Sequence, residues 1–335
     1  MLTPKANLLE TLKREGSPDS LVNMYEPFVT LRNDPIVKYI RGKYQRGTEH
    51  KDPWGTVISW PEDQYAAMPH ITDETKVIPD ITRWREYLRV PDLVENCTDW
   101  SEAIASRDAV DRDSYLVAGF MGTGIFEQTH FLMGFEDTLT NLLIEPDHMR
   151  ELIDIIGEYR LTYAKLLIEN LKPDAIMSHD DWGSKNSLFM QPELWRDMYK
   201  PWYAKIYGYM KEQGVMVIHH ADSYLEPLIE DMVELGIDIW QGVLPTNDIS
   251  TIQKQLDGRM TLMGGIDSGL DRADATESEI RAEAKHVCES FGPGGNFIPC
   301  VTYGAGRTIN PNVYDILFDE IEIHKWTSRK NNYEN

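Results

Sequence analysis

The C-terminal two thirds of the chain alternates short apolar runs with longer segments of helical periodicity. In the segment that begins at Pro146, for example, Met149, Leu152 and Ile156 recur at the spacing of one helix face. Strand-type apolar runs lie at 21–25, 115–120, 174–178, 215–218, 237–240, 260–263 and 296–298. Strands that alternate with helices are typical of a parallel sheet covered by helices. We therefore predict an α/β fold, a (β/α)8 barrel of the TIM type, although the pattern identifies only these seven strands.

The N-terminal part is less regular. Residues 52–76 are interrupted by Pro, Gly and Trp, which indicates a hairpin or a loop over the mouth of the barrel. No linker rich in Pro, Gly or Ser and no internal repeat divides the chain. We predict a single domain over residues 1–335, in which residues 1–110 add helices and a hairpin that cover the barrel.

Composition excludes several classes of partner and environment. The formal net charge is −22, from 33 Lys and Arg against 55 Asp and Glu, and no basic stripe is present. We therefore expect no binding to nucleic acid or to anionic membranes. Three scattered cysteines do not form a disulfide framework, and the first twenty residues lack the apolar core of a secretory signal. These features predict a cytoplasmic location.

Residues that can hold a metal ion follow two of the predicted strands. His220 and Asp222 come directly after the strand at 215–218, and Cys300 ends the last strand. The carboxyl ends of parallel strands meet at one rim, so these side chains could form an open zinc site. His219 would point the other way and pack against helices. Two plainer alternatives remain: Asp222 as a helix N-cap and Cys300 as an inert buried thiol.

The sequence HDDWG supplies a second group of candidates. Adjacent residues of a strand point to opposite sides, so at most one of Asp180 and Asp181 faces the barrel mouth. We select Asp181 as a catalytic residue, and Tyr303, in the loop after Cys300, as another; a turn and a surface loop are the alternatives. The residues at the rim predicted to contact the substrate are Glu26, Trp182 and Gln241.

Three motifs together carry a resemblance to a known family. They are the run from Pro192 to Pro227 (PELWRDMYKPWY…GVMVIHHADSYLEP), the preceding HDDWG and the later NFIPC. In order and spacing they resemble the uroporphyrinogen decarboxylase-like superfamily, and within it the cobalamin-dependent methyltransferases, over roughly residues 110–325. The resemblance implies a TIM barrel with a zinc site of the form His-x-Cys followed by a distant Cys.

The family pattern can be placed on this chain residue by residue. A proline seven positions after the family's histidine matches Pro227, which selects His220, so that the other two ligands fall on Asp222 and Cys300. Aspartate thus stands where the family often has cysteine. If Asp222 is not a ligand, the resemblance leaves Glu26, Asp181 or Asp267 to complete the site. A carboxylate in place of a thiolate gives a more electrophilic metal, suited to polarising an ether or alcohol oxygen.

The resemblance therefore implies a zinc-dependent methyltransferase, the O-demethylase component of a two-step system. Its partners would be a small-molecule methyl donor, such as an aryl methyl ether or methanol, and a separate corrinoid protein whose Co(I) accepts the methyl group. The alternatives are transfer from a methylcorrinoid to an acceptor, a non-catalytic protein of a corrinoid system, and a metal-free uroporphyrinogen decarboxylase. The arginine-rich motif of the decarboxylases (Arg-Gln-Ala-Gly-Arg) and the corrinoid-ligating motif Asp-x-His-x-x-Gly are both absent from the sequence.

Overall fold

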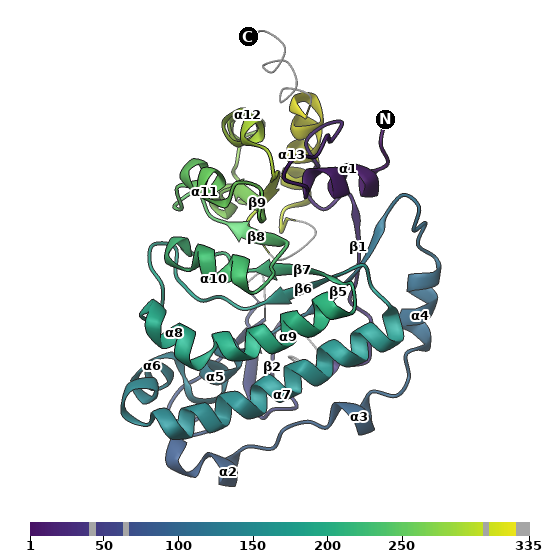
Figure 1. Cartoon of the computed structure of the whole chain (residues 1–335). Coiled ribbons are helices and arrows are strands. Elements are labelled where there is room, and N and C mark those ends of the chain that lie inside the picture. Colours follow the sequence, from purple (N-terminus) through teal and green to yellow (C-terminus); the bar gives the residue numbers. More distant parts are fainter. Residues whose placement is uncertain (40–44, 63–66, 304–307, 326–335) are drawn as a thin grey trace.

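A sheet of parallel strands forms the centre of the molecule (Figure 1). The computed structural model describes residues 1–39, 45–62, 67–303 and 308–325. Within these residues seven strands pair in the order β1-β5-β6-β7-β8-β9-β10, and every pair is parallel. The sheet curls with helices around it, which confirms the predicted TIM-type fold. The strands are β1 (Phe28–Leu31), β5 (Leu116–Met121), β6 (Ala175–His179), β7 (Met216–His220), β8 (Ile239–Val243), β9 (Thr261–Ile266) and β10 (Phe297–Val301).

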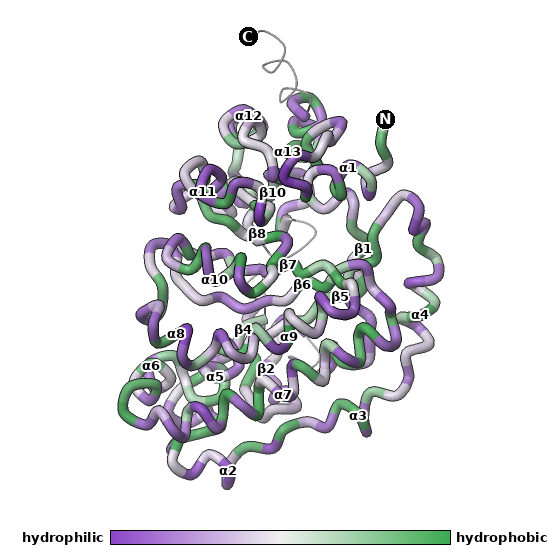
Figure 2. The backbone as a smooth tube through the Cα atoms, in the orientation of Figure 1, coloured by the Kyte–Doolittle hydropathy of each residue, from purple (hydrophilic) through white to green (hydrophobic). Residues whose placement is uncertain are grey.

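Helices follow the strands along the chain and cover the sheet. The longest, α7 (Pro146–Leu171), has proline in its first turn and buries one face, and its colour alternates between hydrophobic and hydrophilic along Figure 2. In the part of the chain that the structure describes, none of the helices combines the length and apolar character needed to cross a bilayer. The other helices are α5 (Ile125–Met133), α6 (Phe135–Ile144), α8 (Pro192–Met198), α9 (Lys200–Glu212), α10 (Ile229–Glu234), α11 (Ile249–Leu256), α12 (Glu277–Phe291) and α13 (Pro311–His324).

The N-terminal part contributes a small antiparallel sheet and short helices. Strands β2 (Thr48–Lys51), β3 (Val57–Trp60) and β4 (Met68–Pro69) form the sheet, which confirms the predicted hairpin. The segment that carries η2 (Ile81–Arg83), α2 (Trp84–Tyr87), α3 (Leu93–Asn96) and α4 (Ser101–Asp108) runs along α7 (Figure 1). The remaining short elements are α1 (Pro4–Thr11) and the single-turn helices η1 (Val37–Tyr39), η3 (Glu226–Leu228), η4 (Ser268–Leu270) and η5 (Gly292–Gly294).

The predicted strand at 21–25 is wrong, because these residues form an irregular segment and a turn, and the first strand begins at Phe28. Met24 has a φ of 48°, which is incompatible with an extended strand. Asn23 is buried and its side-chain amide donates to the Phe318 carbonyl oxygen of α13 at 3.0 Å. The apolar run is therefore buried by packing against α13 rather than by pairing in the sheet.

The segment 192–213 has apolar positions at helical spacing, with Pro201 as a bend or a start. It forms two helices, α8 and α9, which are separated at Tyr199 because Pro201 has no N–H to continue the ladder. Helix α5 was missed altogether. Eight of its nine residues are buried, so it has no polar face and no helical periodicity in its sequence.

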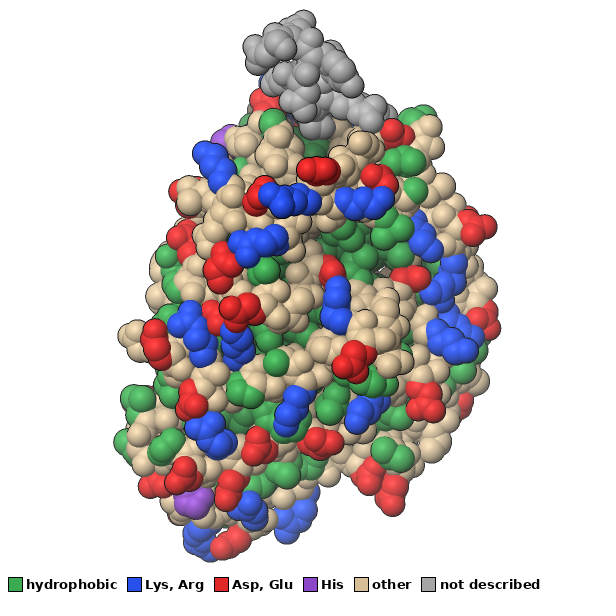
Figure 3. Space-filling model, viewed as in Figure 1, with side chains coloured by type: hydrophobic (Ala, Val, Ile, Leu, Met, Phe, Trp, Pro, Cys, Tyr) green, Lys and Arg blue, Asp and Glu red, His purple; other side chains and the backbone are tan. Residues whose placement is uncertain are grey.

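Charged side chains of both signs are interspersed on the surface. On the face in Figure 3, Lys and Arg side chains alternate with Asp and Glu, and no patch of one sign dominates. Many of these charges form ion pairs, such as Arg259 with Glu230 at 2.7 Å. This distribution fits the absence of a basic stripe in the sequence.

Candidate metal centre

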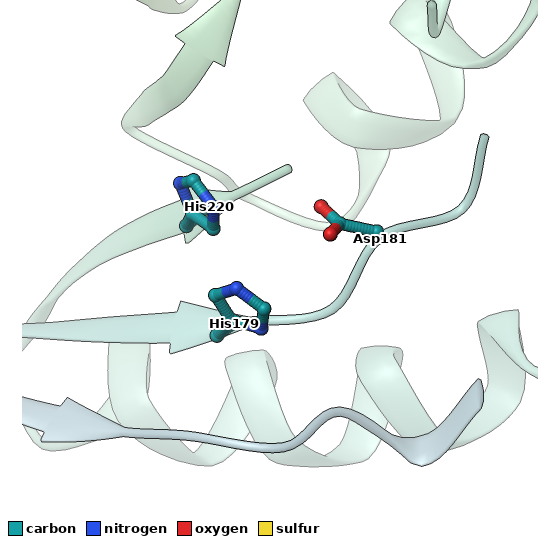
Figure 4. Close-up of side chains that lie close together, drawn as sticks. All are labelled: His179, Asp181 and His220. Carbon is teal, nitrogen blue, oxygen red and sulfur yellow. The ribbon is translucent and has the colours of Figure 1, made fainter. Parts of the chain in front are cut away.

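Two histidines and an aspartate meet at the carboxyl ends of β6 and β7. His179 and His220 are register partners in the two strands, and their rings stack with centroids 4.5 Å apart. Asp181 lies two residues beyond His179, and its carboxylate points back toward both rings (Figure 4). One potential ligand atom from each of the three residues lies within 4.8 Å of the others. Among the described residues this is the group whose geometry suits a metal ion.

The hydrogen bonds of Gln241 fix the tautomer of His220. The amide nitrogen of Gln241 donates to the carbonyl oxygens of Val301 at 3.3 Å and Tyr303 at 3.0 Å. Its amide oxygen is therefore the atom that faces Nδ1 of His220, and Nδ1 must carry the proton and donate it. Nε2 of His220 is left with a lone pair, which is the state that a metal ligand requires.

His179 is held in the same way by a charged acceptor. Its Nδ1 donates to Oε2 of Glu127 at 2.7 Å, which leaves Nε2 as the ligand atom. The same carboxylate oxygen accepts the backbone N–H of Gly124 at 2.9 Å, at the first turn of α5. Glu127 is 6% exposed, so its charge is well shielded from water. The start of α5 thus determines where the ring of His179 lies.

Asp180 points away from the centre and caps α5. Its carboxylate accepts the backbone N–H groups of Phe126 at 3.0 Å and Glu127 at 2.9 Å, and the hydroxyl of Tyr203. A negative charge at the positive end of a helix is favourable. Gly124 makes this approach possible, because a Cβ there would lie 1.8 Å from Cγ of Asp180. As the alternation along a strand predicts, Asp180 and Asp181 face opposite sides.

Aromatic side chains support the centre from the helix side of the sheet. Trp182 is 1% exposed, stacks on His219 with centroids 4.0 Å apart, and donates its indole N–H to Asp180 at 3.1 Å. Nδ1 of His219 lies 2.8 Å from the hydroxyl of Tyr207, which belongs to α9. The prediction that His219 points away from the barrel mouth and packs is confirmed.

Burial and charge set the protonation states at the centre. Burial lowers the pKa of His220 to about 3, so its imidazole is neutral at physiological pH. Burial raises the pKa of Asp181 well above its ordinary value, with the nearby Asp222 carboxylate adding to the rise. Burial likewise raises the pKa of Asp222 to about 6. The neutral imidazole of His220, the His179 ring and the closely spaced carboxyl groups are a donor set that a divalent cation would bind.

Of the three predicted zinc ligands, only His220 lies in the group of residues that suits a metal ion. Asp222 is half-buried and donates its backbone N–H to Oδ1 of Asp181 at 3.1 Å. Cys300 is 1% exposed on β10 opposite Gly265, and burial raises the pKa of its thiol. The metal-ligand roles of Asp222 and Cys300 stay predictions.

The remaining predicted residues have the following positions. The Tyr303 hydroxyl donates to the Ser268 carbonyl oxygen at 3.3 Å, and its catalytic role stays a prediction. Gln241 and Trp182 are fully buried and contact protein groups. Glu26 was expected to follow a strand, which is wrong. It precedes β1 and is exposed at the amino end of the sheet.

Neither His179 nor Glu127 was predicted as a site residue. A signal for His179 was available, because His179-Asp180-Asp181 repeats the His-x-Asp pattern of His220-Ala221-Asp222 at the end of the neighbouring strand. Residues two apart share a face of a strand, so the repeat places two His and two Asp at one rim. No comparable signal identifies Glu127, because its helix was not recognised.

A comparison with models of protein families shows the family to which the chain belongs. Residues 54–322 match the model of the family described as uroporphyrinogen decarboxylase (URO-D). The chain belongs to the uroporphyrinogen decarboxylase family. The matched region contains the candidate metal centre and every strand of the parallel sheet except β1.

Individual members of the uroporphyrinogen decarboxylase family are distant from this chain. A uroporphyrinogen decarboxylase from Thioalkalivibrio sulfidiphilus is 25% identical over 189 residues, 54% of this chain and 50% of the relative. One from Paraburkholderia xenovorans is 22% identical over 259 residues, 71% of this chain and 66% of the relative. The chain thus matches between half and about two thirds of the length of these relatives. Among solved structures, a methyltransferase from Methanosarcina mazei shares the fold, with a TM-score of 0.60 and 17% identity over 96% of this chain and 100% of the other.

Proposed function

We propose that this chain is a metal-dependent methyltransferase that takes a methyl group from an O-methyl compound and passes it to the Co(I) corrinoid of a separate protein. The observation that carries the proposal is the group of His179, Asp181 and His220 at the carboxyl rim of the sheet. Active sites of TIM barrels lie at this rim. The fold that the chain shares with a methyltransferase supports the same reading.

The donor set fits a divalent cation, with zinc as the first choice. Nε2 of His179, Nε2 of His220 and the Asp181 carboxylate would bind it. When bound, such a cation supplies Lewis acidity toward the oxygen of the methyl donor. Three protein ligands leave room for that oxygen, as in catalytic rather than structural zinc sites.

The chain's own residues prepare the centre before any substrate arrives. Glu127 and Gln241 keep the proton of each histidine on Nδ1, and therefore keep both Nε2 lone pairs directed at the rim. The stacked side chains of Trp182 and His219 close the helix side of the centre against water. A methyl donor and the corrinoid protein must consequently approach from the open rim, which is the docking position that we propose for both.

Metal analysis of four proteins tests the ligand set. Anaerobically purified wild type, Asp181→Asn, His179→Ala and Cys300→Ser would be loaded with zinc, desalted and measured by mass spectrometry. We expect about one zinc per chain in the wild type and in Cys300→Ser, and loss in the other two. Loss in Cys300→Ser with retention in Asp181→Asn would instead establish the set His220, Asp222 and Cys300.

Methyl transfer is tested with the loaded wild type. Reduced corrinoid would be mixed with methanol or with an aryl methyl ether, and the conversion of Co(I) to methyl-Co(III) followed by absorbance. We expect conversion with at least one donor, and none with Asp181→Asn. A wild type that binds no zinc, or that binds it and converts no donor in either class, contradicts the proposal.

A second candidate is a decarboxylase, because the curated relatives carry the name uroporphyrinogen decarboxylase. A substrate with many carboxylates calls for several arginines at the site. Of the arginines that influence the centre, Arg160 is buried with its guanidinium bonded to protein oxygens, whereas Arg32 is exposed. Incubation of the metal-free chain with uroporphyrinogen decides this: product with fewer carboxyl groups would favour the decarboxylase.

A further inference from the structure

A small internal cavity lies behind the loop that connects β5 to α5. It is bordered by the apolar side chains of Trp54 and Ile156 and by four polar residues, which are Thr123, Gln128, Tyr159 and Arg160. Its volume of about 10 Å³ gives room for one molecule of the size of water. The polar residues come from three elements, namely the loop, α5 and α7, so the cavity forms where these elements meet.

Each of the four polar residues has a buried atom that makes no hydrogen bond of normal geometry within the described residues, although the Trp54 side chain lies near enough to the Tyr159 hydroxyl to lower its pKa. The atoms are Oγ1 of Thr123, Nε2 of Gln128, the hydroxyl oxygen of Tyr159 and Nε of Arg160. Thr123, Gln128 and Arg160 are at most 6% exposed. Buried polar groups in native proteins are almost always paired with protein or with ordered water. Four such atoms around one cavity therefore point to one shared partner.

We propose that the cavity is a built site for one internal water molecule, which bonds to all four atoms. The donor and acceptor counts match. Nε of Arg160 and Nε2 of Gln128 are donors and would occupy the two lone pairs of the water. The hydroxyl oxygens of Thr123 and Tyr159 can each accept, and would take its two hydrogens. One water thus satisfies every unpaired atom, with the tetrahedral coordination typical of buried water.

The surroundings favour water over a small anion, although Arg160 is positively charged. The carboxylate of Asp52 acts electrostatically on Tyr159, and that of Asp34 acts on Tyr163, one turn along α7. Both acids are buried, so their charges would repel an anion with little screening by solvent. A neutral molecule with two donors and two acceptors is not repelled by these charges.

The water site supports the loop from which the metal centre is built. The guanidinium of Arg160 also donates to the carbonyl oxygens of Gly122, at 2.8 Å, and of Thr123. Thr123 has a φ of 48°, which a non-glycine residue adopts only when its surroundings hold it there. Gly124, the next residue, donates to Glu127. We infer that the water fixes the side chain of Thr123 and so maintains the start of α5.

Crystal structures and unfolding measurements test this inference. Crystals of the wild type grown in sodium bromide should show one water within hydrogen-bond distance of the four atoms, and no anomalous bromine signal in the cavity. An empty cavity or a bromide peak would overturn the proposal. The experiment requires neither metal nor methyl donor, so its outcome is independent of the proposed function.

A matched pair of variants tests the energetic role of the water. Thr123→Val replaces the hydroxyl with a methyl group, so we expect the water to be lost and the unfolding midpoint to fall. Thr261→Val is the control, because Oγ1 of Thr261 is also buried without a partner among the described residues but does not line this cavity. It should leave the midpoint unchanged or raise it. If Thr123→Val fails to fold, Tyr159→Phe replaces it. Equal behaviour of the cavity variant and the control contradicts the proposal.

Discussion

Replacing Gln241 with methionine should weaken metal binding about 10- to 100-fold, which corresponds to about 1.4 to 2.8 kcal/mol. Gln241 accepts the proton on Nδ1 of His220 and so keeps the lone pair on Nε2, at the metal centre. Methionine has a similar volume but no oxygen acceptor. In Gln241→Met the imidazole of His220 is free to carry its proton on either nitrogen, and free to rotate.

The same change should also reduce stability. Methionine removes three hydrogen bonds, one with His220 and two with the carbonyl oxygens of Val301 and Tyr303. At about 1 kcal/mol for each, we expect the free energy of unfolding to fall by about 3 kcal/mol. Metal affinity therefore has to be measured under conditions in which the variant remains folded.

A second variant separates the two effects. Gln241→Glu keeps an oxygen acceptor for His220 but loses both donor hydrogen bonds to the carbonyls. It should be destabilised as well. Its zinc affinity should nevertheless be close to that of the wild type, and no weaker than that of Gln241→Met. Zinc affinity would be measured by competition with a chromophoric chelator, and stability by urea unfolding of the metal-free proteins. Wild-type affinity in folded Gln241→Met would refute the argument that Gln241 selects the tautomer.

Two further predictions concern local features of the fold. Burial raises the pKa of Asp52 from 3.8 to about 6, so the folded state holds the proton of this carboxyl more tightly than the unfolded state does. The free energy of unfolding should therefore fall by about 3 kcal/mol as the pH rises from about 4 to above 6. Asp52→Asn keeps the Oδ1 acceptor of two backbone N–H groups but cannot ionise. Urea unfolding at pH 4 and pH 7 should therefore show that the variant lacks the fall in the free energy of unfolding that Asp52 causes in the wild type. Gly124→Ala places a Cβ 1.8 Å from Cγ of Asp180 and should lower both the unfolding midpoint and zinc affinity. Gly208→Ala is the control, because a Cβ at this helical position would have no atom within 4 Å, and it should raise the free energy of unfolding by up to about 1 kcal/mol. Equal effects of the two alanine substitutions would contradict the steric argument.

The candidate site was only partly predictable. His220 was selected because it ends an apolar run, and Asp181 because alternation along a strand allows one of two adjacent acids to face the mouth. His179 was overlooked although it repeats the pattern of His220, since neither register nor neighbouring strands can be read from one segment alone. Glu127 lies in a helix that is buried almost all round, so the periodicity that reveals a helix was missing. Glu26 was misplaced because an apolar run that packs as a turn resembles a strand.

The sequence by itself determined the alternation of strands and helices, and with it the TIM-type fold and the rim at which polar residues gather. That information is local, because apolar spacing along a few turns or a few strand residues records which face is buried. Only the tertiary structure decided that His179 is the register partner of His220, that Glu127 and Gln241 fix their tautomers, and that Asp180 turns away to cap α5. These contacts join residues from 21 to 54 positions apart, and they depend on distances that no local pattern records.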